Sequence, residues 1–228
     1  MVSIIIPSFN DPDLWKTIDD LRNKAEGDIE IISIENKPMR QAINEGVAQA
    51  SGEWIMKCDA HCVFDQGFDV KILANIEKNW VVIPRRYKLD VKKWEVMDEP
   101  PVDYMRVLVT DEKLSGVEWR RAGRPMVDTT MVFQGSCWFM SKEHFNNIGG
   151  LQTEGFGTFT QEPIEIAFNT WLSGGKVMVN KNTWYAHKHR KFGRTYAGLT
   201  HSQEVKDGNA YSRAKYIDRI QEIEKLCS

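Results

Sequence analysis

Short apolar runs alternate with helical periodicity over the first third of the chain. Residues 2–6 form an apolar run of the kind found in buried parallel strands. Between residues 14 and 25 the apolar side chains recur at every third or fourth position, so that they share one face of a helix. A second run at residues 29–34, a second helical pattern that Gly52 ends, and a third run at residues 53–57 follow. This β-α-β-α-β order predicts a mostly parallel sheet wound by right-handed crossovers.

The periodicity is lost between residues 84 and 128, after a helical pattern near residues 66–78 and a short strand at residues 81–83. A loop of this length is uncommon inside a compact domain, so we expect an elaborated, functional loop region there. Regular patterns then return and predict strands at residues 129–133, 137–140, 176–179 and 183–187, helices from Ser141 and Pro163, and a C-terminal helix. We find no repeat and no clear linker, which predicts a single domain.

Composition narrows the class of protein. The chain has 228 residues, of which 42% are hydrophobic, enough for one large domain. Its 30 Lys and Arg against 32 Asp and Glu exclude a strongly basic nucleic-acid coat and an acidic tail, but allow a local basic groove. No apolar run approaches the roughly 20 residues that span a bilayer, and the N-terminal run is too short for a signal peptide. We therefore expect no membrane segment, a cytoplasmic location, and free thiols at the four cysteines.

Polar residues gather where the predicted parallel strands end. Ligands of open α/β sheets bind at the carboxyl ends of the strands, and three such ends carry residues 7–10, residues 35–36 and Asp59-Ala60-His61. Asp59 and His61 offer an oxygen and an imidazole to one ion, a pair that suits Mn²⁺ among other divalent cations. The alternative is that Asp59 caps a helix and His61 is a surface histidine.

Longer motifs around this pair resemble a known family. Residues 44–55, followed by Asp59-Ala60-His61-Cys62, resemble the N-x-G-x-x-x-A-x-G-x-Y/W-I/L and D-x-D patterns of family 2 glycosyltransferases. The histidine departs from D-x-D and resembles the D-x-H of the polypeptide N-acetylgalactosaminyltransferases. Further on, residues 134–142, 161–175 and 186–191 resemble the sugar-side strand, the G-E-N-x-E helix and the G-H-V-F-R-K segment of those transferases. The likeness covers roughly residues 2–194, in the same order.

The resemblance implies an α/β GT-A fold, with a mostly parallel, Rossmann-like sheet flanked by helices in one domain. It divides the chain into a nucleotide-binding half at residues 1–83 and an acceptor-side insertion at 84–128. A sugar and acceptor half at 129–200 and a C-terminal helix at 201–228 complete the domain.

The resemblance also implies the residues of a site. Asp59, His61 and His187 would bind Mn²⁺ or Mg²⁺, with His189 as the alternative to His187. The nucleotide-sugar, a UDP-sugar, would contact Pro7, Ser8, Asn10, Glu35, Arg40, Asn44, Asp59, Gly135, Ser136, Trp138, Lys188 and Arg190. Within this set Glu35 would accept from the uracil N3–H, and Arg40 would contact the uracil or a phosphate. Lys188, Arg190, Lys191 and Arg194 would close over the diphosphate or form a solvated basic loop, and Trp138 would border the sugar or belong to the core.

Glu162 and Asp59 are the catalytic candidates. Inverting family 2 enzymes carry a Glu-Asp pair at the position of Glu162, and the Asp serves as the general base. Pro163 replaces that Asp and has no base to offer, which favours retention of the anomeric configuration. Glu162 would then orient the acceptor or a sugar hydroxyl, or only stabilise the start of a helix.

The acceptor stays open in the sequence. A protein, a glycan and a hydroxymethylated pyrimidine in DNA, as in viruses that modify their own DNA, are the three hydroxyl acceptors considered. The block Arg85-Arg86-Tyr87-Lys88, with Lys92, Lys93 and Trp94, would supply positive charge and aromatic side chains to DNA, and Lys92 and Lys93 would contact phosphates if the acceptor is DNA. The alternative of another class is a catalytically inactive nucleotide-sugar binding module. A nucleotidyltransferase would need a Gly-rich N-terminal loop, which residues 8–11 do not form. The donor sugar and the oligomeric state are not determined.

Overall fold

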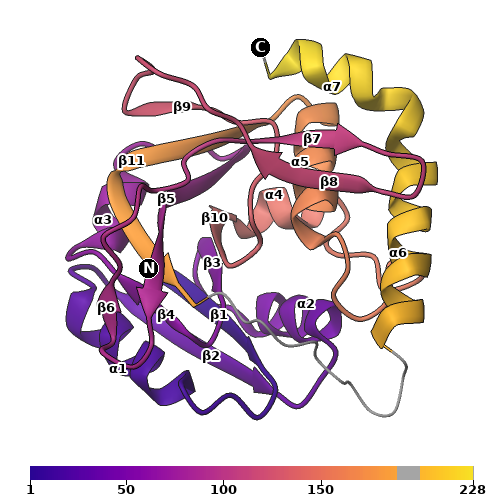
Figure 1. Cartoon of the computed structure of the whole chain (residues 1–228). Helices are drawn as coiled ribbons and strands as arrows, with labels where there is room; N and C mark the ends of the chain where they lie inside the picture. Colours follow the sequence, from indigo (N-terminus) through magenta and orange to yellow (C-terminus); the bar gives the residue numbers. More distant parts are fainter. Residues whose placement is uncertain (189–200, 228) are drawn as a thin grey trace.

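A mixed β-sheet runs through the middle of the computed structural model, which describes residues 1–188 and 201–227 (Figure 1). Within those residues the sheet has nine strands, in the order β2-β1-β3-β10-β5-β11-β4, with β6 paired to β5 and β9 paired to β11. The strands are β1 (Val2–Ser8), β2 (Ile29–Glu35), β3 (Trp54–Cys58), β4 (Cys62–Phe64), β5 (Trp80–Asp90), β6 (Glu95–Val96), β9 (Val127–Thr129), β10 (Cys137–Ser141) and β11 (Lys176–His187). A separate hairpin joins β7 (Met105–Val109) to β8 (Leu114–Glu118).

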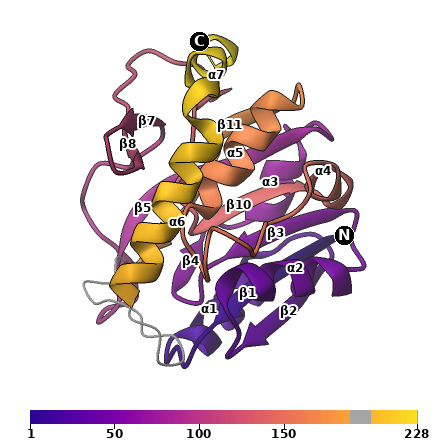
Figure 2. The ribbon, with the colours of Figure 1, turned by 90° about the vertical axis from the view of Figure 1, so that its right-hand side faces the viewer.

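Helices cover both faces of this sheet. Helices α1 (Leu14–Lys24) and α3 (Phe68–Leu73) lie on one side, and α2 (Met39–Gln49), α4 (Lys142–Asn147) and α5 (Glu162–Leu172) lie on the other (Figure 1). Helix α6 (His201–Tyr216), a 3₁₀ turn (Ile217–Arg219) and α7 (Ile220–Leu226) run along the outside of α5 (Figure 2). No helix in the described residues combines the length and the apolar character needed to cross a membrane.

The predicted β-α-β-α-β start is confirmed. Strand β1 pairs in parallel with β2 on one side and with β3 on the other, and its residues Val2 to Ile6 are fully buried. Gly46 of α2 lies directly over this strand, where an added Cβ would come within 2.5 Å of the Ile5 side chain. Glycine thus lets α2 approach the sheet closely, and the carboxyl ends of β1, β2 and β3 reach the same edge.

The segment at residues 84–128 differs from the predicted loop region. Strand β5 does not stop near residue 83 but continues to Asp90, because β11 pairs beside it as far as Lys88. Pro84 and alternating charges hide this strand from periodicity analysis, and the pairing shifts register opposite residues 180–184. The two predicted strands at residues 176–179 and 183–187 are therefore one strand, β11. The predicted strand at residues 129–133 is displaced to β9, and the helix predicted near 66–78 shortens to α3.

The predicted free thiols are confirmed. Cys58, Cys62, Cys137 and Cys227 are buried and form no disulfide. Burial raises the pKa of the thiols of Cys58, Cys62 and Cys137 well above its usual value, so these groups pack as small apolar side chains.

A buried ion pair joins the two halves of the fold. Arg40 at the start of α2 is completely buried and forms an ion pair with Glu165 of α5, which is 1% exposed. The guanidinium also donates to the carbonyl oxygens of Gln152 and Thr160, so it fixes the loop that precedes α5. The structure thus places Arg40, which the family resemblance implied as a uracil or phosphate contact, inside a packing interaction between α2 and α5.

Replacement of Arg40 by Met should lower the free energy of unfolding by about 3 kcal/mol, because the buried Glu165 carboxylate loses its main partner. Lys37→Met, which removes the exposed pair of Lys37 with Glu45, is the control and should cost less than about 1 kcal/mol. Urea denaturation of both variants measures the difference. Equal losses would mean that Arg40 does not stabilise the fold through its charge.

Candidate active site

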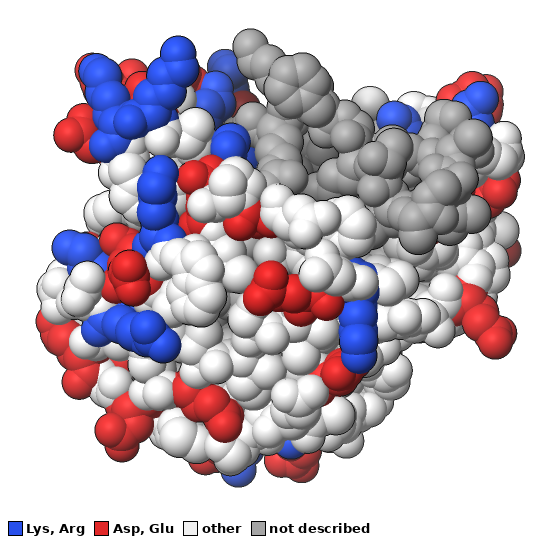
Figure 3. Space-filling model, turned by 90° about the horizontal axis from the view of Figure 1, so that it is seen from below, with Lys and Arg blue, Asp and Glu red and all other residues white. Residues whose placement is uncertain are grey.

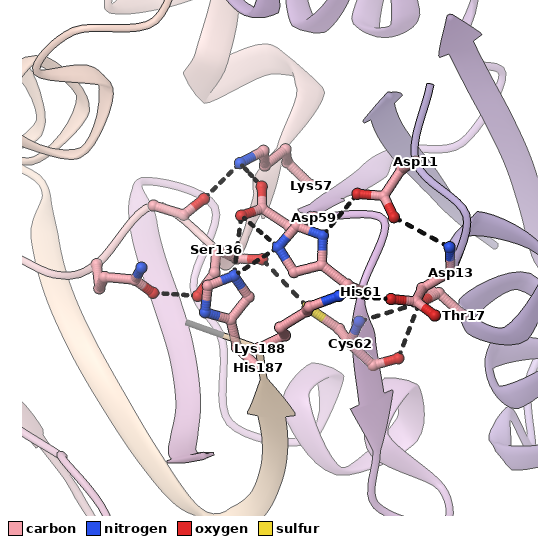
Figure 4. Close-up of polar contacts among 12 residues, drawn as sticks. Asp11, Asp13, Thr17, Lys57, Asp59, His61, Cys62, Ser136, His187 and Lys188 are labelled. Atoms are coloured by element: carbon pink, nitrogen blue, oxygen red, sulfur yellow. Dashed lines mark hydrogen bonds and ion pairs between the residues drawn. The ribbon is translucent and has the colours of Figure 1, made fainter. Parts of the chain in front are cut away.

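Three predicted metal ligands come together at the carboxyl edge of the sheet (Figure 4). Asp59 follows β3, His61 precedes β4, and His187 ends β11, which pairs with β4 so that His187 lies opposite Cys62. The His187 Nε2 atom is 3.1 Å from Asp59 Oδ2 and 3.1 Å from His61 Nε2. The ligand atoms of the three residues all lie within 4.8 Å of one another. One carboxylate oxygen and two imidazole nitrogens thus face a common point.

The Asp11 carboxylate orients the His61 ring for metal binding. Its Oδ2 atom lies 2.9 Å from His61 Nδ1, as Figure 4 shows. Because a carboxylate only accepts, Nδ1 carries the proton and the Nε2 lone pair points towards Asp59 and His187. A carboxylate behind a histidine is the usual support of a metal-bound imidazole, and the oxygen and nitrogen donors suit a divalent cation such as Mn²⁺. The residues present therefore fit the cation that the sequence predicts.

Lys57 is a site residue that the sequence reasoning missed. It is 1% exposed, and its Nζ atom donates to Asp59 Oδ1 at 2.8 Å and to the carbonyl oxygen of Gly135. Burial alone would raise the pKa of Asp59, but the ammonium of Lys57 and the adjacent His187 outweigh it and hold this pKa well below its usual value. A lysine two residues before Asp59 in an otherwise apolar strand was the available signal, because alternate residues of a strand share a face.

Glu162 lies on the other side of Lys57. It is 1% exposed at the first turn of α5, where its Oε1 accepts from Trp138 Nε1 at 2.6 Å and its Oε2 lies 3.5 Å from Lys57 Nζ. Burial raises the pKa of Glu162, against the opposing effects of Lys57 and the Trp138 hydrogen bond. Both carboxylate oxygens are engaged by the protein. Trp138 is completely buried, so it acts as a core residue whose indole N–H also binds Glu162.

The residues expected around the nucleotide separate into two groups. Pro7 and Ser8 end β1 opposite Ile34 and Glu35 of β2, so these four residues reach the predicted edge together. Asn10 follows with a positive φ of 47°, a conformation that asparagine tolerates better than most residues. Asn44, by contrast, points into the protein, where its amide both donates to and accepts from the backbone of Leu151.

Gly135 and Ser136, which the resemblance implies beside the sugar, lie next to the predicted metal ligands. The carbonyl oxygen of Ser136 accepts from the Asp59 backbone N–H at 2.9 Å, and its hydroxyl is 2.8 Å from the Tyr185 hydroxyl. This contact holds the turn after β3 against the loop before β10.

Lys188 is the one member of the predicted basic clamp whose position the structure describes. Its Nζ lies 2.9 Å from Asp13 Oδ2, and its backbone N–H donates to the carbonyl oxygen of His61 at 3.2 Å. His189, Arg190, Lys191 and Arg194 lie outside the described residues.

Two members of the basic block proposed for DNA are paired with acidic groups. Arg85 binds Asp103 through two hydrogen bonds of 2.8 and 2.7 Å, and Lys88 forms an ion pair with Glu99. On the face seen from below, the described Lys and Arg side chains are interspersed with Asp and Glu rather than gathered into a field of one sign (Figure 3).

Gly135→Ala should lower the free energy of unfolding by about 1–3 kcal/mol, because the position is overpacked. The added Cβ would lie 2.9 Å from Glu162 Oε2, and Trp138 and Lys57 prevent that carboxylate from moving away. Gly116→Ala is the control, because its Cβ would have its nearest contact with the flexible end of Met105, at 3.2 Å, and an ordinary contact with Val132 at 3.9 Å. Urea denaturation of the two variants gives the comparison, and similar losses would argue against a rigid Glu162.

Comparison with known proteins supplies the family. The model of the family Glycosyl transferase family 2 matches residues 35–149, half of the chain. Polypeptide N-acetylgalactosaminyltransferase 5 of Caenorhabditis elegans is 22% identical over 82% of the chain, and polypeptide N-acetylgalactosaminyltransferase 3 of Mus musculus is 27% identical over 72%. These matches span 32% and 29% of those proteins, so the chain corresponds to about a third of the relatives' length.

Solved structures agree on the architecture. GalNAc-T7, crystallised with UDP, GalNAc and Mn²⁺, superposes with a TM-score of 0.74 at 17% identity, over 99% of this chain and 54% of that one. The mannosyltransferase PcManGT of Pyrobaculum calidifontis, in complex with GDP-Man and Mn²⁺, gives a TM-score of 0.57 at 12% identity, over 99% and 73% of the two chains. Because the family model matches half of the chain and GalNAc-T7 superposes on 99% of it, this chain belongs to glycosyl transferase family 2 and has the GT-A fold.

Proposed function

We propose that this chain transfers a sugar from a UDP-sugar to a hydroxyl acceptor, with a divalent cation, Mn²⁺ or Mg²⁺, and with retention of the anomeric configuration. The observation that carries the proposal is the convergence of Asp59, His61 and His187, with Asp11 setting the tautomer of His61. The relatives support it, since two of them are named for transferring N-acetylgalactosamine to polypeptides, and GalNAc-T7 was crystallised with UDP and Mn²⁺.

Asp59, His61 and His187 would hold the cation, which neutralises charge on the diphosphate as the UDP leaves. The other residues position the donor. Ser8 and Glu35 would contact the nucleoside from the ends of β1 and β2, and Lys188 would add a positive charge near the diphosphate. Gly135 and Ser136 lie beside Asp59, and Ser136 would border the sugar.

Retention is supported by the surroundings of Glu162. The position that would hold a general base is occupied by Pro163, and both oxygens of the adjacent Glu162 are held by Trp138 and Lys57. A carboxylate that is buried and engaged in this way is poorly placed to take a proton from an acceptor. In a same-face mechanism the leaving phosphate can take that proton instead.

A polypeptide hydroxyl is the first acceptor to test, because two of the matched relatives act on polypeptides by name. A glycan acceptor is the second. The paired state of Arg85 and Lys88 gives no support to a DNA acceptor.

Asp11→Asn should weaken Mn²⁺ binding in the presence of UDP by about 10- to 100-fold, because the supporting carboxylate of His61 is lost. Asp59→Ala should remove the dependence of UDP binding on Mn²⁺ altogether. Asp65→Asn, which affects only the partly exposed pair with Lys71, should leave both affinities unchanged. Calorimetric titration of UDP with Mn²⁺ or with EDTA measures these effects. If UDP binds the unaltered chain equally well in EDTA, the cation is not part of the site.

A panel of UDP-sugars with Mn²⁺, scored for slow release of UDP without any acceptor, should identify the donor. For the best donor, proton NMR of the first product formed should show the anomeric configuration of the UDP-sugar. An inverted product would require another carboxylate as base, and no release from any UDP-sugar would argue for a binding module instead of an enzyme.

A further inference from the structure

The ammonium group of Lys57 lies in an unexpected position. It contacts Asp59, a residue that is proposed to bind a metal cation. Its side chain is 1% exposed and points in the same direction as Asp59, two residues further along the chain. Its Nζ is 2.8 Å from Asp59 Oδ1, while Asp59 Oδ2 faces His187 at 3.1 Å. One carboxylate oxygen therefore faces the ligand cluster and the other is bound to an ammonium.

This arrangement changes the charge of the ligand set. Asp59 is its only carboxylate, because His61 and His187 contribute imidazole nitrogens. The ammonium at 2.8 Å offsets the single negative charge that would attract a divalent cation. The bond also occupies Oδ1 of Asp59, so the oxygen that faces the other two ligands is Oδ2.

Two further contacts hold the ammonium in its position. The carbonyl oxygen of Gly135 accepts from Nζ, and Glu162 Oε2 lies 3.5 Å away. Glu162 is itself held in place by a hydrogen bond from Trp138 at 2.6 Å, so it cannot follow Lys57. If Lys57 turned away, this buried carboxylate would lose its cationic partner.

We propose that Lys57 makes the cation bind together with the nucleotide diphosphate rather than alone. The inference rests on the proposed function and names the regulation of the same site. Without nucleotide, Lys57 offsets the charge of the one carboxylate ligand and the set offers three donor atoms, so the cation binds weakly. The diphosphate brings negative charge and further oxygen ligands, and the cation then binds tightly. By linkage, UDP and Mn²⁺ strengthen the binding of each other by the same factor. Lys57 is a positioning residue in this account, because it acts through Asp59.

The test measures Mn²⁺ binding to the full chain by the EPR signal of free Mn²⁺, with and without saturating UDP. The unaltered chain should bind Mn²⁺ at least about tenfold more tightly with UDP than without it, as expected for opposing charges a few ångströms apart. Lys57→Met keeps the length of the side chain and removes its charge, so Mn²⁺ alone should bind about tenfold more tightly or better.

Because Lys57→Met leaves Glu162 buried without its cation, the double variant Lys57→Met/Glu162→Gln is compared with Glu162→Gln alone. Circular dichroism checks that each variant is folded. Lys71→Met, which removes the partly exposed pair with Asp65, is the matched control and should not change Mn²⁺ binding.

A folded double variant that binds Mn²⁺ alone no more tightly than Glu162→Gln would overturn the inference alone. Mn²⁺ binding that UDP does not strengthen in the unaltered chain would overturn the inference together with the cation of the proposed function, because by linkage UDP would then bind equally well in EDTA. The comparison of the unaltered chain with and without UDP needs no variant, so it tests the inference even if the substituted chains do not fold. A chain that binds no Mn²⁺ under either condition would instead overturn the cation of the proposed function, and the inference with it.

Discussion

The negative charge of Asp59, whose side chain is only 13% exposed, is the constraint on which the rest of this site depends. A carboxylate at the end of a central strand loses its hydration, and its ionised form persists only with partners that replace that hydration. Lys57, His187 and His61 are those partners, and they come from β3, the end of β11 and the turn before β4. The antiparallel placement of β10 beside β3 adds the Ser136 carbonyl oxygen to the same group. The order of the strands in the sheet thus determines which groups can reach the Asp59 carboxylate.

Helix α5 shows how the same requirement ties the site to the fold. Its first turn carries two buried carboxylates, Glu162 and Glu165, and each faces a different buried cation. Glu162 faces Lys57 of β3, whereas Glu165 faces Arg40 of α2, with Lys215 of α6 at 3.4 Å as a second partner. The helix is therefore held at both ends of one turn by charges from distant parts of the chain. A displacement of the first turn of α5 would therefore also disturb its contacts with α2 and α6.

The match to the family model ends at residue 149, before His187 and Glu162. His187 joins the site because β11 runs beside β5 and also pairs with β4, and Glu162 joins it from the first turn of α5. A site of this kind depends on pairings across more than a hundred residues, since His61 and His187 are 126 positions apart. The placement of these residues in the site thus depends on the whole sheet and not on one continuous sequence motif.

Local patterns determined much of this protein in advance. The apolar runs and helical spacing of the first third predicted β1 to β3 correctly, because a strand or helix is set mainly by residues close to it in sequence. The Asp59-Ala60-His61 motif indicated the carboxyl edge of the sheet for the same reason, and the structure brings His187 to that edge as well. Only the tertiary structure showed that residues 84–128 form strands and hairpins, that Arg40 and Asn44 turn into the protein, and that Asp11 and Lys57 support the ligands. These features depend on which distant charges and strands meet when the chain packs, and a buried ion pair leaves no periodic signal in the sequence on either side of it.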